Sequence, residues 1–128
     1  MQALLDTHTF LWWISDDARL SKAARAAIAP AQNRIFVSAA SAWEVATKVR
    51  IGKLASMAPV VERYDDLLAE HRFEPLPVHA SHALLSGSLD ADHRDPFDRM
   101  LAAQSQIERL PLITKDPAFA KFATEVIW

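Results

Sequence analysis

The amino-acid sequence predicts an α/β fold in which a parallel central sheet carries helices on both faces. Short apolar runs alternate along the chain with stretches of helical periodicity. Strands that are separated by helices pair in parallel through right-handed crossovers, which place helices on both sides of the sheet. The length of 128 residues fits one domain, so we expect a single domain over 1–128.

The expected strands are short and lie at 3–5, 35–37, 73–78, 112–114 and 125–128. One helix is expected to begin at Thr7, and further helices are expected at 39–51, 57–70, 96–108 and 117–122. Gly52 marks the end of the second of these helices. The run 57–70 has the apolar spacing of an amphipathic helix. The two prolines in 73–78 remove ladder donors, so we expect that strand at an edge of the sheet.

Composition favours an ordinary globular protein. Fourteen basic and sixteen acidic residues give a net charge of -2, so bulk charge does not indicate a nucleic-acid-binding protein. Cysteine is absent, which suits a reducing compartment. The amino terminus lacks the basic segment of a signal peptide, and no apolar run approaches the roughly 20 residues that span a bilayer. We therefore expect a soluble, cytoplasmic protein without a membrane partner.

Four acidic residues far apart in the sequence follow apolar runs, at points where helices should begin. They are Asp6, Glu44, Asp98 and Asp116. In a parallel sheet such points lie along one edge, so these side chains are expected to converge on one acidic pocket. Carboxylates held close together raise one another's pKa unless a cation or a proton compensates, and the pattern therefore indicates a metal site.

Each carboxylate also has a purely structural interpretation. Asp6 is a favourable N-cap for the helix at Thr7, and Ser41 with Glu44 matches a capping box. Asp95 and Asp116 each precede a proline, as at many helix starts. Asp98, one turn into its helix, would complement the helix dipole. Capping and metal binding are compatible, because the geometry that makes these residues caps also directs them toward one crevice.

Oxygen ligands without cysteine or a histidine pair favour a hard cation, Mg²⁺ or Mn²⁺, over zinc. Water activated by such an ion could attack a phosphodiester in line. Asp6 and Asp98 are the expected direct ligands. Glu44 and Asp116 would complete the site, through water or by holding a second ion.

Several neighbours of these carboxylates are weaker candidates. Thr7 and Thr114 could bind a carboxylate, although local backbone contacts are commoner at such positions. Lys48, four residues after Glu44, could reach a phosphate, but an ordinary ion pair on one helix face is favoured. Arg99 and Lys115 lie beside Asp98 and Asp116 in sequence, where a phosphate could pass.

The histidine nearest to these carboxylates is His93, which could donate a proton to a leaving oxygen, although a surface loop histidine is favoured. Trp12, Trp13 and Trp43 are expected to fill the core. Adjacent tryptophans cannot both face inward on one helix, so either Trp12 or Trp13 is a candidate contact for a partner chain.

Four segments together resemble a known family: LLDTHTFLWW, SAASAWEVATK, HRDPFDRMLAAQ and LITKD, in this order. The sequence is similar end to end to the PIN domain, specifically the VapC-like toxin ribonucleases of bacterial toxin–antitoxin pairs. The resemblance implies a three-layer α/β/α fold, Mg²⁺- or Mn²⁺-dependent endoribonuclease activity on RNA, a cognate antitoxin that blocks the site, and a homodimer. It also implies that the acidic quartet is Asp6, Glu44, Asp98 and Asp116, whereas Asp95 has no required counterpart.

Two other functions are compatible with the same residues. A metal-dependent phosphatase or DNA nuclease would use this acidic chemistry on a different phosphate ester. A non-catalytic interaction module would keep the fold for binding alone, although such a protein would be expected to have lost acidic positions.

Overall fold

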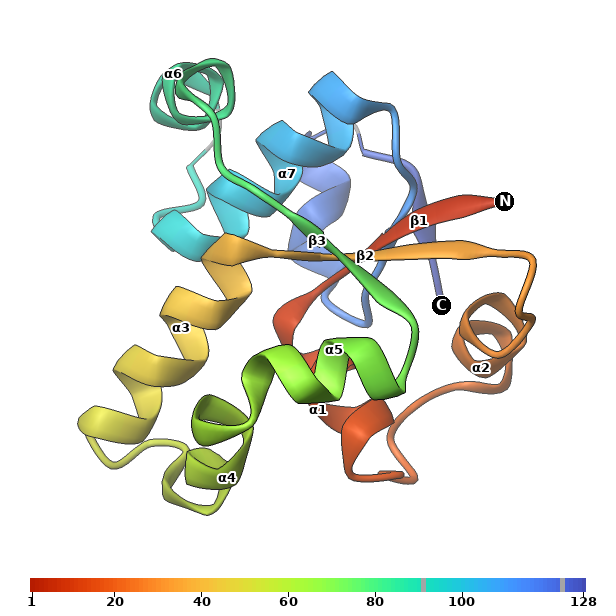
Figure 1. Cartoon of the computed structure of the whole chain (residues 1–128). Helices are drawn as coiled ribbons and strands as arrows, with labels where there is room; N and C mark the ends of the chain where they lie inside the picture. Colours follow the sequence, from red (N-terminus) through yellow and green to blue (C-terminus); the bar gives the residue numbers. More distant parts are fainter. Residues whose placement is uncertain (91, 123) are drawn as a thin grey trace.

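The computed structural model of the chain describes residues 1–90, 92–122 and 124–128. Its centre is a five-stranded, fully parallel sheet with the strand order β3-β2-β1-β4-β5. The strands are β1 (Gln2–Leu5), β2 (Arg34–Ser38), β3 (Phe73–Leu76), β4 (Leu112–Ile113) and β5 (Val126–Ile127). The parallel α/β fold predicted from the sequence is therefore confirmed, with β1 at the middle of the sheet (Figure 1).

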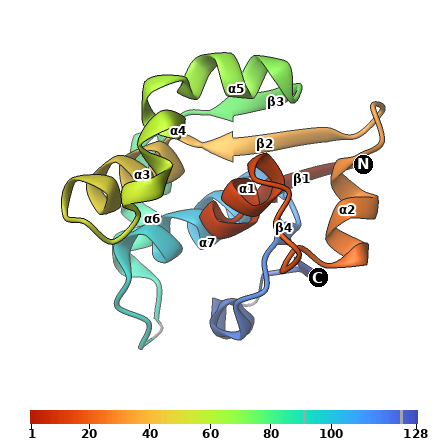
Figure 2. The ribbon, with the colours of Figure 1, turned by 90° about the horizontal axis from the view of Figure 1, so that it is seen from below.

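Helices cover both faces of this sheet, as a three-layer α/β/α fold requires. Successive strand residues point to opposite faces: Leu5 belongs to one buried cluster and Leu4 to the other. The first cluster packs against α1 (Thr7–Ile14) and α2 (Lys22–Ile28), and the second against α7 (Pro96–Glu108). Figures 1 and 2 show α1 and α7 on different sides of the strands.

The remaining helices complete these two outer layers. They are α3 (Ala39–Arg50), α4 (Ala58–Glu62), α5 (Tyr64–Glu70), α6 (Ala80–Ser88) and the 3₁₀ helices η1 (Ala55–Met57) and η2 (Pro117–Phe122). α3 ends where predicted, because Gly52 follows it with φ 82°, a backbone conformation that favours glycine. The short helix expected at 117–122 is thus present as a 3₁₀ helix.

The single helix expected over 57–70 is wrong. The chain bends at Arg63, so that α4 and α5 are separate helices that follow η1. Val60 and Leu67 are both buried in the first cluster, and the bend places Tyr64 edge-on against Phe10 with ring centroids 6.0 Å apart. Amphipathic spacing cannot distinguish one helix from two that bury the same face.

Two α-helices in the described part of the chain are additional to those expected from the sequence. α2 starts at Ser21, whose side chain accepts a hydrogen bond from the Ala24 amide in an ordinary N-cap. α6 packs against α7 through buried His82, whose Nε2 lies 2.8 Å from Glu108 Oε1. Gly87 and four polar residues weaken the helical pattern of α6, so its existence depends on this tertiary packing.

The edge position predicted for the strand at 73–78 is confirmed. β3 pairs only with β2 in the sheet, and Pro75 lies opposite Val37 without the need to donate to a further strand. No helix in the described part of the chain is long and apolar enough to cross a membrane.

Candidate active site

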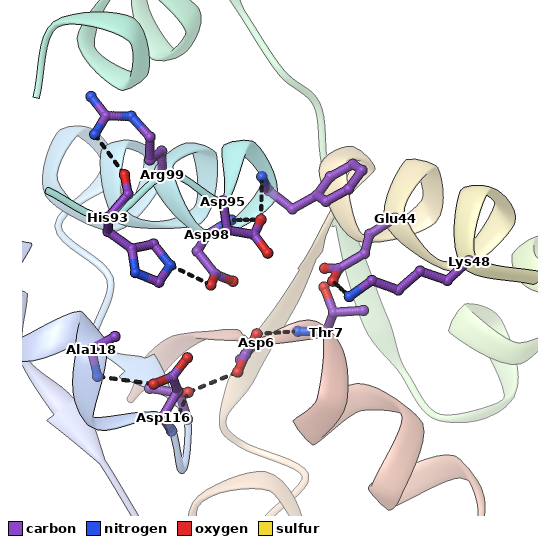
Figure 3. A network of polar contacts seen from close by, with 12 residues as sticks. Asp6, Thr7, Glu44, Lys48, His93, Asp95, Asp98, Arg99, Asp116 and Ala118 are labelled. Atoms are coloured by element: carbon purple, nitrogen blue, oxygen red, sulfur yellow. Dashed lines mark hydrogen bonds and ion pairs between the residues drawn. The ribbon is translucent and has the colours of Figure 1, made fainter. Parts of the chain in front are cut away.

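Strand order brings the predicted carboxylates to one edge of the sheet. β2, β1 and β4 are neighbours, and all three end on the same side because they run in parallel. Asp6 directly follows β1, Asp116 lies shortly after β4, and α3 leaves the end of β2 carrying Glu44. The start of α7 adds Asp95 and Asp98 (Figure 3). Residues far apart in the sequence, such as Asp6 and Asp116, thus meet at one place.

Asp6 is buried and held at both oxygens. Oδ1 accepts a hydrogen bond of 2.7 Å from the Thr7 amide at the N-terminus of α1, and Oδ2 accepts one of 2.7 Å from the Thr114 hydroxyl. Burial raises the pKa of Asp6 to about 6, and the charge of Glu44 adds to this rise, although the Thr114 hydrogen bond opposes it. Asp6 therefore caps α1, as predicted, and also lies among the other acidic side chains at this edge of the sheet.

Glu44 enters the site from the second turn of α3 rather than from its first. The N-cap is Ser38, whose side chain accepts a hydrogen bond from Ala40 N, so the capping box predicted at Ser41 is wrong. The Ser41 hydroxyl instead lies 2.8 Å from that of Thr7, tying α3 to α1. The Glu44 side chain is only 3% exposed.

Lys48 pairs with one oxygen of Glu44, and the other oxygen has no partner among the described residues. Lys48 Nζ donates to Glu44 Oε2, the ion pair expected from their spacing. Burial alone would lower the pKa of Lys48, but this hydrogen bond and the charge of Glu44 outweigh it and raise the pKa. Glu44 Oε1 is buried and accepts no hydrogen bond from the described residues. A buried acceptor without a donor is costly, which suits an oxygen that serves a cation.

Asp98 lies in the first turn of α7, whose N-cap is Asp95. Asp95 Oδ1 accepts hydrogen bonds from the amides of Phe97 (2.9 Å) and Asp98 (3.2 Å), which confirms the predicted cap before Pro96. Burial raises the pKa of Asp98 to about 7, and the charges of Asp95, Asp6 and Glu44 add to the rise.

His93 is held against Asp98 rather than exposed. It lies in the loop before α7, as expected, but its side chain is half-buried, and Nε2 is 2.7 Å from Asp98 Oδ2. Its ring also packs edge-on against Phe122, with centroids 5.5 Å apart. The hydrogen bond from His93 lowers the pKa of Asp98 and so opposes the effect of burial.

Asp116 opens η2. Its Oδ1 accepts a hydrogen bond of 2.9 Å from the Ala118 amide, and its own amide donates to the Thr114 hydroxyl at 3.0 Å. Thr114 thus connects Asp6 with the Asp116 backbone, a role its sequence position left open.

Arg99 donates to the carbonyls of Ser86, His93 and Leu89, so it braces the loop before α7.

All four predicted carboxylates line one cavity of about 520 Å³. Its lining residues are Asp6, His8, Trp12, Arg19, Glu44, Lys48, Asp95, Asp98, Lys115, Asp116 and Pro117. Figure 3 shows the carboxylates of Asp6, Glu44 and Asp98 directed toward a common space. The sequence interpretation did not include His8 and Arg19, and it assigned Trp12 to the core or to a partner contact.

The donor set is suited to a hard cation, although the ligands are not already closed around one. Every anionic group is a carboxylate, and two of them have raised pKa values because they are buried near other negative charges. Among the described residues, however, no three Asp, Glu, His or Cys side chains form a ready group for one ion. Mg²⁺ commonly binds through one or two carboxylates and keeps several waters, and this arrangement fits that pattern.

The expectation that all three early tryptophans fill the core is wrong for Trp43. Trp12 and Trp13 are partly buried against the first cluster. Trp43 is 59% exposed and packs edge-on against Phe97, with ring centroids 4.7 Å apart. Its position on α3, one residue before Glu44, places it outward while Glu44 faces inward, because neighbouring helix residues diverge by about 100°.

Comparison with known proteins identifies the family of the chain. The family model of the PIN domain matches residues 3–125. Ribonuclease VapC22 of Mycobacterium tuberculosis is 32% identical over 114 residues, a match that covers 88% of this chain and 85% of that protein. Ribonuclease VapC16 of the same organism is 39% identical over 67 residues, which is 50% of this chain and 48% of that protein.

Solved structures share the fold at lower identity. The chain is similar to VapBC2 from Rickettsia felis bound to a DNA fragment from its promoter, with a TM-score of 0.71, 18% identity and coverage of 98% and 97% of the two chains. It is also similar to VapBC-1 from nontypeable Haemophilus influenzae, with a TM-score of 0.68, 16% identity and coverage of 98% and 96%. With a matching family model over nearly its whole length, the chain belongs to the PIN domain family and, within it, to the VapC-like ribonucleases.

Proposed function

We propose that the protein is a metal-dependent endoribonuclease that hydrolyses RNA phosphodiester bonds and acts as the toxin of a toxin–antitoxin pair. The observation that carries this proposal is the single cavity shared by Asp6, Glu44, Asp98 and Asp116 at the carboxyl edge of the sheet. The ribonuclease names of the VapC relatives support RNA as the substrate. We take residues 1–128 as one functional domain.

Mg²⁺ or Mn²⁺ is the cofactor that these residues fit. Asp6 and Asp98 are the direct ligands in this proposal, and Glu44 and Asp116 complete the site. Glu44 Oε1 is buried and has no hydrogen-bond partner in the described part of the chain, which supports a cation there. When bound, such an ion makes water a better nucleophile at neutral pH and offsets the charge that builds on the phosphate oxygens.

The neighbouring side chains fix the positions of these carboxylates. Thr114 and the Thr7 amide hold the two oxygens of Asp6, and Lys48 holds one oxygen of Glu44. His93 holds Asp98 Oδ2 from the side of the loop. Each carboxylate therefore keeps its orientation without help from substrate, which lowers the reorganisation needed during the reaction.

A cognate antitoxin and a second copy of the chain are the proposed protein partners. The similar structures are described as VapBC or toxin–antitoxin complexes, which supports an antitoxin partner for this chain. Trp43 is exposed and packs against the partly buried Phe97 beside the site, which makes Trp43 a candidate for such a contact. An RNA-cleaving toxin acts where cellular RNA is, so we place its action in the cytoplasm.

The substrate class can be tested by offering three phosphate esters to the purified protein. With Mg²⁺ or Mn²⁺, we expect cleavage of structured RNA, no comparable cleavage of duplex DNA or a small phosphomonoester, and no activity in EDTA. Gel analysis of end-labelled strands and release of a chromogenic alcohol measure the three reactions. Hydrolysis of the phosphomonoester alone would indicate a phosphatase, and cleavage of DNA alone would indicate a DNA nuclease.

The toxin role can be tested by growth. We expect induced expression of the chain to slow or stop growth, and co-expression of the cognate antitoxin to restore the wild-type rate. Growth curves with quantified soluble protein provide the measurement. Normal growth at confirmed expression would contradict the toxin role while leaving the nuclease assay unaffected.

A further inference from the structure

The cavity has a cationic and aromatic wall beside its acidic centre. His8 and Trp12 lie four residues apart on one face of α1, the helix whose N-cap is Asp6, and Arg19 follows from the loop after that helix. Resting on the proposed RNA cleavage, we infer that Trp12 and Arg19 form a subsite that stacks an unpaired base next to the bond to be cut.

The geometry of this pair provides a flat, charged surface. Arg19 Cζ lies over the Trp12 ring, 4.9 Å from its centroid, which is within the range of cation–π contacts. Trp12 is itself fixed by Trp128 and His8, whose ring centroids lie 5.8 and 5.9 Å from that of Trp12. Guanidinium planes and aromatic rings are the groups on which proteins stack unpaired RNA bases.

Arg19 is held in place before any ligand arrives. Its Nε and Nη2 donate to the two oxygens of Asp17 at 3.0 and 2.8 Å, and its amide also donates to Asp17 Oδ1. These hydrogen bonds lower the pKa of Asp17 to about 2, so the pair stays charged. Asp17 is fixed in turn, because its amide donates to Trp12 O and its carbonyl accepts from Arg25. A preorganised group loses little entropy on binding.

The same arginine remains able to contact RNA. Its side chain is 63% exposed, and Nη1 makes no hydrogen bond to the described residues. Five carboxylates line the cavity, so a polyanion needs cations close by to approach it. Trp12 lies six residues beyond Asp6 on α1, roughly 9 Å along the helix axis, which places the subsite next to the acidic centre.

The substrate that fits this surface is single-stranded RNA. A base in a duplex is covered on both faces by its neighbours, whereas a base in a loop or an unpaired strand can stack on a protein surface. Contacts to phosphate alone would not distinguish between these forms. Trp12 and Arg19 therefore select which base is held beside the bond that is cut.

Arg34 offers a matched control. Its guanidinium also donates two hydrogen bonds to one carboxylate, that of Glu74, and Cζ lies 5.3 Å from the Phe36 ring centroid. It lies at the start of β2, at the opposite end of the strands from the cavity. If the Arg19 contacts serve only local structure, Arg19→Lys and Arg34→Lys should behave alike.

Binding without cleavage provides the test. A fluorescently labelled short RNA strand is titrated in EDTA against wild type, Arg19→Lys and Arg34→Lys, and anisotropy gives Kd. We expect Arg19→Lys, which keeps the charge but loses the planar group, to weaken binding about tenfold, and Arg34→Lys to match wild type. Equal binding by all three proteins, or an equal loss in both variants, would overturn the inference.

A scan with abasic sites separates the base from its phosphate. Removing single bases from the strand should weaken wild-type binding at one position, and Arg19→Lys should no longer sense that position. If the variant stays as sensitive as wild type, Arg19 does not hold a base. If wild type cleaves RNA and Arg19→Lys cleaves it with the same kcat/KM, the base-stacking subsite is refuted and the proposed function stands. If wild type does not cleave RNA, the proposed function itself is refuted.

Discussion

Asp98→Asn should remove metal-dependent RNA cleavage while leaving the protein folded. The asparagine has nearly the same shape and can keep a hydrogen bond with His93, but it carries no charge to hold a divalent cation. Losing a group that stabilises charge in a hydrolytic site typically reduces kcat by about a hundred- to a thousandfold, and we expect a loss at least of this size. Initial rates of RNA cleavage with Mg²⁺ and with Mn²⁺ provide the measurement.

Asp66→Asn is the control for this substitution. Asp66 is the third residue of α5, just as Asp98 is the third residue of α7, so both lie in the first turn of a helix. Asp66 is exposed and does not line the cavity. Loss of a favourable contact with the helix dipole is therefore common to both variants, whereas loss of a metal ligand is specific to Asp98→Asn. Wild-type rates in Asp98→Asn would exclude Asp98 as a ligand.

The sequence predicts the parts of this site that depend on local structure. Asp6 follows β1 and Asp95 follows a loop, and each caps a helix, so residue type and neighbours suffice to place them. Asp6, Glu44 and Asp116 converge because they follow parallel strands that end on one side of the sheet. Asp98 does not follow a strand, contrary to the expectation, because α7 comes after α6 and a loop. The alternation of apolar runs is enough to predict the sheet, and the prolines of the strand that contains Pro75 predict its edge position.

Contacts between remote residues account for what the sequence does not predict. Glu44 reaches the site from the second turn of α3, and the position of that turn depends on Ser38 as the cap and on the contact between Ser41 and Thr7. Arg19 reaches the cavity from a loop that Arg25 of the next helix holds in place. Such loop geometry has no periodic signal, which is why the cationic wall is visible only in the structure.

Without metal, the protein should lose stability as the pH rises from about 4 to about 7. Asp6 and Asp98 have an ordinary pKa of 3.8, and in the folded protein burial raises these values to about 6 and about 7. Between these limits the folded state holds protons that the unfolded chain has released. The contribution of these protons to the free energy of unfolding is therefore complete below about pH 4 and is lost as the pH passes the folded pKa values.

The expected loss is large for a domain of this size. A pKa difference of one corresponds to about 1.4 kcal/mol, so the rise at Asp6 alone corresponds to a loss on the order of 3 kcal/mol. Asp98 acts in the same direction, but its titration is linked to that of Asp6, so we add no separate contribution for it. In a melting experiment this corresponds to a fall in Tm of about 10 °C in EDTA. Other groups titrate in the same range, so the informative quantity is the difference between variants.

Asp98→Asn isolates the contribution of the site, since its amide needs no proton. The variant should show a smaller fall in Tm between the same pH limits, and near pH 7 in EDTA it should be more stable than wild type, because a buried repulsive charge has gone. Adding Mg²⁺ or Mn²⁺ near pH 7 should raise the Tm of wild type and of Asp66→Asn, because an ion that binds only the folded state stabilises it. The same ions should have little effect on the Tm of Asp98→Asn. If Tm varied with pH in the same way for wild type and Asp98→Asn, the expected role of Asp98 would be wrong. A carboxylate that is repelled by its neighbours in the folded protein must stabilise the fold when it takes up a proton, and asparagine cannot do so.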